Sequence, residues 1–139
     1  MADFGVAEAH HHVAAALLVS GGRVLLCHRH PDRQWYPDVW DLPGGHIDDG
    51  EAPSDALRRE LQEELGVSVD LSSVEPWRVL TPAPDLTLHV WLVERWDGTI
   101  ENHAPDEHDE IGWFWSEETD ALNLVDHFLE EMISDATAG

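Results

Sequence analysis

The sequence predicts an α/β domain, and three observations lead to that prediction. Short apolar runs at 13–19, 24–29 and 86–96 have the length and composition of β-strands. A stretch with helical spacing lies between them at 53–65, and another follows near the end of the chain at 122–133. The length of 139 residues suits one domain with a single core.

The first two predicted strands form a hairpin. Residues 13–19 indicate a buried strand, the glycine-containing segment 20–23 indicates a tight turn, and residues 24–29 return. Three adjacent histidines at 10–12 can bind a metal, but successive side chains of a strand point to opposite faces, so we interpret this run as the start of the strand. Residues 1–9 are expected to form a loose arm before a single domain at 10–139.

The next segment, 30–40, is expected to be a loop over the entrance of a site, because it is polar and contains Pro31 and Pro37. It also carries Trp35, Tyr36 and Trp40. Aromatic rings here can stack on a flat ligand or cap the core, and the sequence leaves both alternatives open.

The helix predicted at 53–65 has clear start and stop signals. Pro53 suits the first turn, where the missing N–H costs nothing, and Gly66 is typical of a helix end. Apolar residues recur at helical spacing as Ala56, Leu57, Leu61 and Leu65.

Three glutamates of this helix, Glu60, Glu63 and Glu64, share one side at spacing i, i+3 and i+4. Like charges at this spacing destabilise a helix, and near its C-terminal end they also oppose the macrodipole. A bound divalent cation would offset the repulsion, since Mg²⁺ prefers carboxylate oxygens. The alternative is a solvated acidic face, which is common in a chain this acidic.

The whole pattern from Gly45 to Val67 resembles the Nudix box: glycine, five residues, glutamate, seven residues, then Arg-Glu-aliphatic-any-Glu-Glu-any-Gly-aliphatic. Every defining position is filled. The resemblance implies a hydrolase of nucleoside diphosphates linked to another group, dependent on Mg²⁺ or Mn²⁺. It also implies a specific fold, an α/β/α sandwich with a mixed central sheet.

The same resemblance implies the metal-binding residues. Glu63 and Glu64 are the first expected ligands, helped by the carbonyl of Gly44. A further carboxylate is expected from the loop before the last strand, where Glu110 matches best and Glu107 is the second choice.

Other roles in the reaction also follow from the resemblance. Glu60 is expected to be the general base or a further ligand. Arg59 is expected to pair with Glu51 or with a glutamate of the box and to orient it. Hydrolysis of a phosphoanhydride requires an activated water, neutralisation of phosphate charge and in-line positioning, which such a set can supply.

The second half of the chain is expected to alternate strands and loops before a final helix. The expected elements are a strand at 68–80 with a turn near 70–73, a loop at 81–85, a strand at 86–96, an acidic loop at 102–109 and a strand at 111–115. Ser116 is expected to cap a helix that continues through 122–133, with 134–139 frayed.

Three residues are expected at the substrate. In MutT-type Nudix proteins an arginine at the place of Arg29 lies at the nucleotide pocket, Leu42 matches a position lining the base pocket, and Asp126 matches a base-reading residue. The stretch from Trp91 to Gly98 also resembles MutT-type sequences.

These resemblances favour a purine nucleoside triphosphate, oxidised forms included, cleaved to monophosphate and pyrophosphate. ADP-ribose, another nucleotide sugar or a dinucleoside polyphosphate is the alternative. A catalytically silent ligand-sensing module is a third interpretation, which the intact box argues against.

Composition narrows the partners. Arginine supplies all 7 basic residues against 29 acidic ones, for a formal net charge of −22, which would repel a nucleic acid polymer. We therefore expect a small nucleotide rather than a polymer as the partner, and the sequence leaves both a monomer and a homodimer open. The single cysteine, Cys27, fits a reducing compartment, and the sequence lacks a membrane-length apolar run and a signal peptide, so we expect a cytoplasmic protein.

Overall fold

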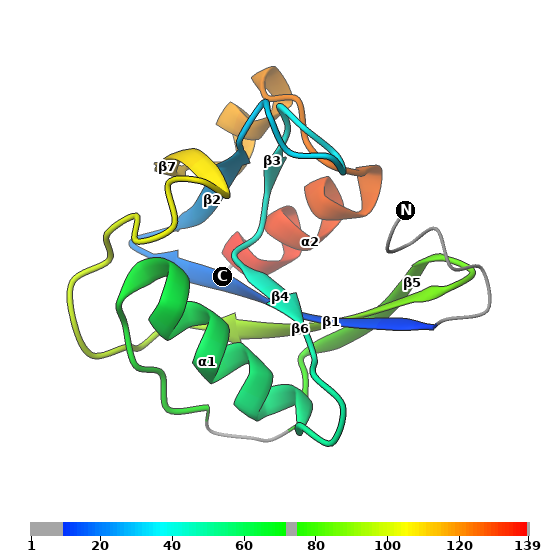
Figure 1. Ribbon diagram of the computed structural model, residues 1–139. Helices are drawn as coiled ribbons and strands as arrows, with labels where there is room; N and C mark the ends of the chain where they lie inside the picture. Colours follow the sequence, from blue (N-terminus) through cyan, green and yellow to red (C-terminus); the bar gives the residue numbers. More distant parts are fainter. Residues whose placement is uncertain (1–9, 72–74, 139) are drawn as a thin grey trace.

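The computed structural model describes residues 10–71 and 75–138, so the expected arm at 1–9 and part of the expected turn near 70–73 lie outside the described residues. Two α-helices cover opposite sides of a sheet, which gives three layers (Figure 1). In chain order the elements are β1 (His11–Ser20), β2 (Arg23–Arg29), β3 (Trp40–Asp41), β4 (Gly44–His46), α1 (Pro53–Leu65), β5 (Arg78–Ala83), β6 (Leu86–Val93), β7 (His108–Phe114), the 3₁₀ helix η2 (Ser116–Ala121) and α2 (His127–Thr137).

The central strand β1 separates two apolar cores because its side chains alternate between the faces of the sheet. Ala14, Ala16 and Leu18 belong to the core shared with α1. Ala15 and Leu17 belong to the core shared with α2. An uninterrupted apolar run was therefore the correct sign of a strand buried on both faces.

The sheet has the order β3-β2-β1-β6-β5, with β4 added to β1 and β7 added to β2. β1 and β6 run parallel, whereas the other pairs are antiparallel, so the sheet is mixed as expected. One edge of β1 is divided between two partners: β2 pairs near Val19 and Ser20, and β4 pairs at Val13–Ala15. β2 and β4 therefore diverge from β1.

The helix α1 forms as predicted. Pro53 occupies its first turn, and Leu57, Leu61 and Leu65 are fully buried. Gly66 ends it in the left-handed conformation at φ 73°, where a side chain would be strained, and its N–H donates to the carbonyl of Gln62.

The prediction of a helix over 122–133 was wrong at both ends. The N–H of Trp40 donates to the carbonyl of Asn123, and the N–H of Val125 donates to the carbonyl of Trp40, so this segment pairs with β3 instead. Tertiary pairing overrides the helical pattern here. α2 begins only at His127, with Asp126 as its N-cap, and continues to Thr137 through residues expected to fray.

Other boundaries also differ from the prediction. β5 extends to Ala83 across the expected loop at 81–85, which an edge strand permits even with Pro82. Within the strand expected at 68–80, Ser68 forms an isolated bridge, and β5 begins only at Arg78. β6 ends at Val93, and β7 begins at His108, earlier than expected.

Candidate active site

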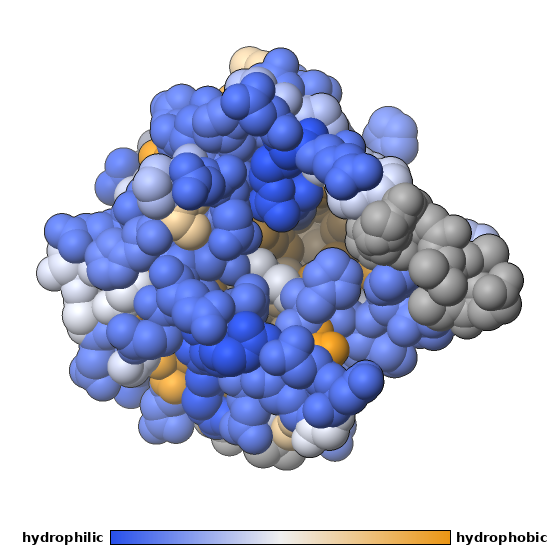
Figure 2. Space-filling view, viewed as in Figure 1, coloured by the Kyte–Doolittle hydropathy of each residue, from blue (hydrophilic) through white to orange (hydrophobic). Residues whose placement is uncertain are grey.

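A cavity of about 420 Å³ opens where β2 and β4 diverge from β1, and its size is typical of a small-molecule site. Figure 2 shows the hollow as an apolar floor surrounded by a polar rim. Val13 and Ala15 of β1 contribute to the lining. The split in the sheet therefore creates the pocket.

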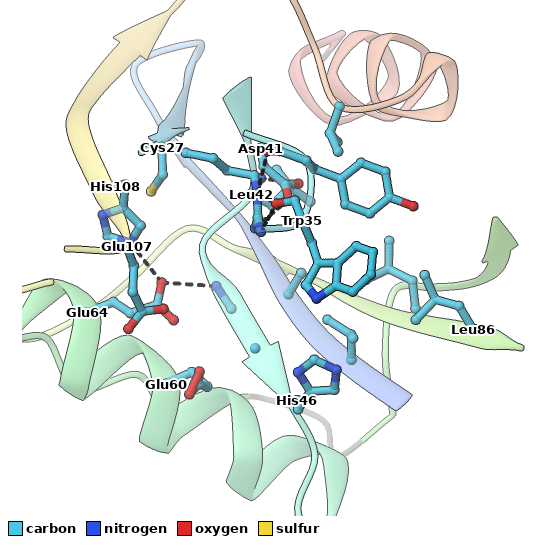
Figure 3. A pocket seen from close by; sticks show the side chains of 18 of the residues that line it. Cys27, Trp35, Asp41, Leu42, His46, Glu60, Glu64, Leu86, Glu107 and His108 are labelled. Carbon is cyan, nitrogen blue, oxygen red and sulfur yellow. Dashed lines mark hydrogen bonds and ion pairs between the residues drawn. The ribbon is translucent and has the colours of Figure 1, made fainter. Parts of the chain in front are cut away.

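One end of the pocket is acidic. Glu60 and Glu64 lie on α1, and Glu107 lies just before β7; Figure 3 shows their carboxylates gathered at this end. The spacing of four residues on α1 places the first two side chains on one side of the helix. Glu107 comes from a segment distant in sequence and is 3.8 Å from the guanidinium of Arg33.

The carboxylate of Glu64 is buried, with only 3 % of the residue exposed. Its Oε1 lies 3.4 Å from the N–H of Gly44 and 3.2 Å from Nε2 of His108. Its Oε2 is buried and has no hydrogen-bond partner in the described structure. A buried carboxylate oxygen without a partner is costly, and the cost is offset either by a hydrogen bond between the carboxyls of Glu60 and Glu64 when one of them is protonated, or by a bound cation when both are ionised.

Both helix carboxyls hold their protons more tightly than usual. Burial, followed by the nearby charge of Glu64, raises the pKa of Glu60 to about 8. Burial, followed by the charge of Glu107, raises the pKa of Glu64 to about 8. A divalent cation would reverse these effects because it stabilises the ionised carboxylates.

Arg59 connects the acidic groups around this end. Its Nε and Nη2 donate to the two carboxylate oxygens of Glu51 at 2.9 and 3.0 Å, and its Nη1 donates to Glu60 at 3.0 Å. The hydrogen bonds from Arg59 lower the pKa of Glu51. Nη2 also donates to the carbonyl of His46, so one guanidinium joins the helix to β4.

Two glycines allow this close packing. A Cβ on Gly45 would collide with the carboxylate of Glu60, and a Cβ on Gly44 would collide with the backbone of Ala14. Gly44 also has φ 148°, which glycine tolerates best. Gly44 lines the pocket, as expected for a residue whose carbonyl was predicted to bind metal.

Two residues of the predicted metal set lie away from the cavity. Glu63 has a side chain that is 58 % exposed, and it contacts Nη1 of Arg59 at 3.4 Å. Glu110 lies inside β7, opposite His28, and is exposed. Glu107, the second choice, lines the pocket, whereas Glu63 and Glu110 do not.

The other end of the pocket is mainly apolar and aromatic. Trp35 and Leu86 lie there, away from the acidic side chains (Figure 3), and Leu42 is a buried part of the lining. The aromatic residues of the 30–40 loop divide between the two predicted roles. Trp35 and Tyr36 line the pocket, and Trp40 packs in the core.

Arg29 lines the pocket but uses its side chain to hold the loop above it. Its Nη2 donates to the carbonyl of Trp35 at 2.7 Å, and its Nε donates to the carbonyl of Tyr36 at 2.9 Å. Its Nη1 lies 3.8 Å from Asp41. Burial lowers the pKa of Arg29.

Two aspartates also line the pocket. Asp41 lines the pocket, and burial raises its pKa. Asp126 also lines the pocket and caps α2 by accepting a hydrogen bond from the N–H of His127 at 2.6 Å. Asp126 therefore has a structural function whatever its contact with substrate.

Several site residues were missed in the sequence. His108 and Asn102 form a hydrogen-bonded set behind Glu64, and Asp41 faces the apolar end. Asp41 follows an aromatic residue directly before the Leu-Pro-Gly-Gly lead into the box, which was a usable signal. His108 lies in a segment that resembled an exposed acidic loop, so its burial gave no local signal.

A divalent cation fits the donors at the acidic end. Within residues 10–71 and 75–138, no three acidic, histidine or cysteine side chains converge as a closed metal cage. Mg²⁺ does not need one, because it usually keeps several waters and binds one or two carboxylates together with substrate phosphates. The unpartnered Oε2 of Glu64, with Glu60 and Glu107 nearby, offers such an open set.

The sequence matches the NUDIX domain over residues 9–135. The chain belongs to the Nudix family. This Nudix hydrolase is 31 % identical over 122 residues to the nucleoside triphosphatase NudI of Enterobacter sp. (strain 638), an alignment that covers 81 % of this chain and 86 % of the relative.

Solved structures have the same fold. A MutT NUDIX hydrolase from Burkholderia pseudomallei superposes with a TM-score of 0.74 at 26 % identity, covering 91 % of this Nudix hydrolase and 96 % of that chain. The E. coli ORF135 protein gives a TM-score of 0.73 at 28 % identity, covering 94 % and 95 %. The predicted α/β/α fold with a mixed sheet and the Nudix assignment are therefore confirmed. None of the described helices is long and apolar enough to cross a membrane.

Proposed function

We propose that this protein hydrolyses purine nucleoside triphosphates, including oxidised forms, to a nucleoside monophosphate and pyrophosphate with the aid of Mg²⁺ or Mn²⁺. The observation that carries the proposal is the buried, unpartnered Oε2 of Glu64 beside Glu60, at the opposite end of the pocket from Trp35. A triphosphate directed to the acidic end would place its base at the aromatic end. The name of the Enterobacter relative, a nucleoside triphosphatase, agrees with this substrate class.

At the acidic end, Glu64, Glu107 and the carbonyl of Gly44 are the proposed metal ligands. The bound cation would neutralise phosphate charge and lower the pKa of an attacking water. Glu60 is the proposed general base, because its carboxylate lines the pocket and a bound cation would keep it ionised by reversing the effects that raise its pKa to about 8. Arg59 holds Glu60 by a hydrogen bond of 3.0 Å.

Glu63 remains among the proposed catalytic residues because its side chain contacts Arg59. It contacts the same guanidinium nitrogen, Nη1, that donates to Glu60. Removal of the Glu63 charge therefore leaves Arg59 with less negative charge around its guanidinium, even though the Glu63 side chain is exposed. Glu107 replaces Glu110 as the proposed loop ligand because only Glu107 lines the pocket.

At the aromatic end, Trp35 provides a face for stacking, and the carboxyls of Asp41 and Asp126 provide hydrogen-bonding groups for the edge of a base. A purine has the larger ring system and stacks over more of the indole. Arg29 acts here by fixing the backbone of Trp35 and Tyr36.

The test is a comparison of kcat/KM for dGTP, 8-oxo-dGTP, dATP and dCTP with Mg²⁺, with ADP-ribose and diadenosine polyphosphates alongside. The expected products are a monophosphate and pyrophosphate, and a chelator should abolish turnover. A tenfold lead for ADP-ribose or a dinucleoside polyphosphate, about 1.4 kcal/mol of transition-state preference, would replace the proposed substrate class. Full activity after exhaustive chelation would overturn the metal assignment.

A further inference from the structure

The proposed reaction leaves one buried titratable side chain at the acidic end without a function. His108 is the first residue of β7, is only 4 % exposed, and pairs with Arg29 beside a bulge in β2. Its ring lies behind Glu64 (Figure 3), with Nε2 3.2 Å from Oε1 of that carboxylate.

The side chain of Asn102 fixes the orientation and tautomer of His108. Its Nδ2 donates to the carbonyl of His108 at 2.8 Å, and its Oδ1 accepts from the N–H of Ala104 at 3.1 Å, so the amide can have only one orientation. The oxygen therefore faces Nδ1 of His108 at 3.1 Å. Because an amide oxygen only accepts, Nδ1 must carry a proton. The contact between Nε2 and Oε1 of Glu64 is therefore a hydrogen bond when one further proton lies between these two atoms, donated either by a protonated Glu64 to the neutral imidazole or by an imidazolium to the ionised Glu64.

This arrangement acts on one oxygen of Glu64. Oε1 is held by His108 and by the N–H of Gly44, whereas Oε2 has no partner and remains available. The same segment also holds the backbone of α1, because the N–H of His103 donates to the carbonyl of Glu64 at 2.7 Å. Both the helix end and the carboxylate are thus fixed by residues 101–108.

We infer that His108, anchored by Asn102, is a positioning residue that holds Glu64 by Oε1 and leaves Oε2 directed toward the metal. The inference rests on the proposed metal-dependent function. His108 does not itself need to contact the cation or the substrate. Residues that orient a metal-binding carboxylate in this way typically change metal affinity about 10- to 100-fold when mutated.

Three substitutions separate the contacts of His108. His108→Gln keeps a side-chain N–H near the place of Nε2 and can still donate to Glu64. His108→Asn keeps an amide near the place of Nδ1 but is too short to reach Glu64, and His108→Leu removes both contacts. His103→Gln is the matched control, because that side chain lies in the same segment but pairs with Glu101 instead of Glu64.

The measurement is the Kd for Mn²⁺ without substrate, by paramagnetic resonance titration, with the unfolding temperature in chelator as the check on folding. We expect about 10- to 100-fold weaker binding for the Leu and Asn variants, most of it recovered in the Gln variant, and no change in His103→Gln. Asn102→Ala keeps the imidazole of His108 but removes the side chain that orients it, so it should weaken Mn²⁺ binding to an intermediate degree. This variant replaces His108→Leu as the test if His108→Leu does not fold.

Two outcomes would overturn this inference and leave the proposed function intact. One is a Kd for Mn²⁺ in His108→Leu, His108→Asn and Asn102→Ala that equals the wild-type Kd. The other is a His108→Gln variant that binds Mn²⁺ as weakly as His108→Leu. Wild-type protein that binds no Mn²⁺ would instead overturn the metal in the proposed function, and the inference with it. The two failures are therefore distinguishable by the wild-type titration.

Discussion

The two ends of the pocket are built differently. At the acidic end, Glu60 and Glu64 project from the regular helix α1, and charged or polar groups hold them: Arg59, His108 and the N–H of Gly44. At the aromatic end, Trp35 and Tyr36 lie on a loop, and Arg29 holds them by their backbone carbonyls.

This difference has a functional consequence. Contacts to backbone carbonyls do not depend on the identity of the side chains at 35 and 36, so the loop can change its side chains while keeping its path. The acidic end has no such freedom, because its contacts are made by the side chains themselves. We therefore expect changes at the acidic end to reduce turnover for every substrate and changes at the aromatic end to redistribute preference among substrates.

The largest effect should come from Glu64→Gln. Loss of this charge removes the buried carboxylate oxygen assigned to the metal, and several kcal/mol of charge stabilisation corresponds to a decrease in kcat of about 10³-fold. Glu63→Gln should cost less, because that side chain is exposed and contacts Arg59. Steady-state kinetics at saturating Mg²⁺ measures both, and a larger loss for Glu63→Gln would show that the exposed carboxylate moves into the site.

The second effect separates the two candidates for the loop ligand. Glu107→Gln should lower kcat about tenfold, which corresponds to about 1.4 kcal/mol, and should weaken activation by Mn²⁺, because Glu107 lies near Glu64 at the acidic end of the pocket. Glu110→Gln is the matched control three residues later, at an exposed position of β7, and it should behave as wild type. The assignment would return to Glu110 if the order of the two losses were reversed.

The third prediction concerns stability. The pKa values of Glu60 and Glu64 are raised to about 8 in the folded protein, above the ordinary glutamate value, so folding favours their protonated forms. This contribution is complete below the unfolded pKa, near 4.5, and is lost as pH rises toward 8. In chelator, the unfolding temperature should therefore fall between pH 5 and pH 8.

Two comparisons separate this effect from the general repulsion in a chain of net charge −22. Glu60→Gln/Glu64→Gln should flatten the slope, whereas Glu94→Gln/Glu131→Gln, at two exposed positions outside the pocket lining, should leave it unchanged. Mn²⁺ should raise the unfolding temperature more at pH 8 than at pH 5, because it binds the ionised carboxylates. Equal slopes in both double variants would assign the effect to net charge.

The contrast between the two ends also explains what the sequence could predict. Glu60 and Glu64 were identifiable because α1 carries its own start signal, stop signal and apolar spacing, so local sequence determines which side chains share a face. β1 was identifiable for the same reason, because seven consecutive apolar residues at 13–19 indicate a strand.

The remainder depends on contacts between segments distant in sequence. Residues 122–125 have a helical pattern but pair with Trp40, so α2 starts at His127 and Asp126 becomes an N-cap. The burial of His108 depends on Glu64, which precedes it by 44 residues. No local pattern encodes either contact. Glu107 was ranked below Glu110 because that order rested on the match to the family's loop position, which carries no information on which side chain enters the pocket.

The smallest and most selective effect should come from Asp126→Asn. Asn caps helices about as well as Asp, so this change keeps the cap of α2, whereas Asp126→Ala would lose about 0.5–2 kcal/mol of stability and confuse the result. The substitution removes the carboxylate acceptor and introduces an amide donor in the pocket lining. Asp126 is exposed before substrate binds, so it discriminates between bases only where the bound base covers it and a mismatch leaves its polar group unpaired; the ratio of kcat/KM between dGTP and dATP should then change about tenfold, with a smaller change in kcat for the better substrate. An equal decrease in kcat/KM for every nucleotide would show that Asp126 contributes to turnover in general, as the acidic end does. An unchanged ratio of kcat/KM together with an unchanged unfolding temperature would limit its function to the N-cap of α2.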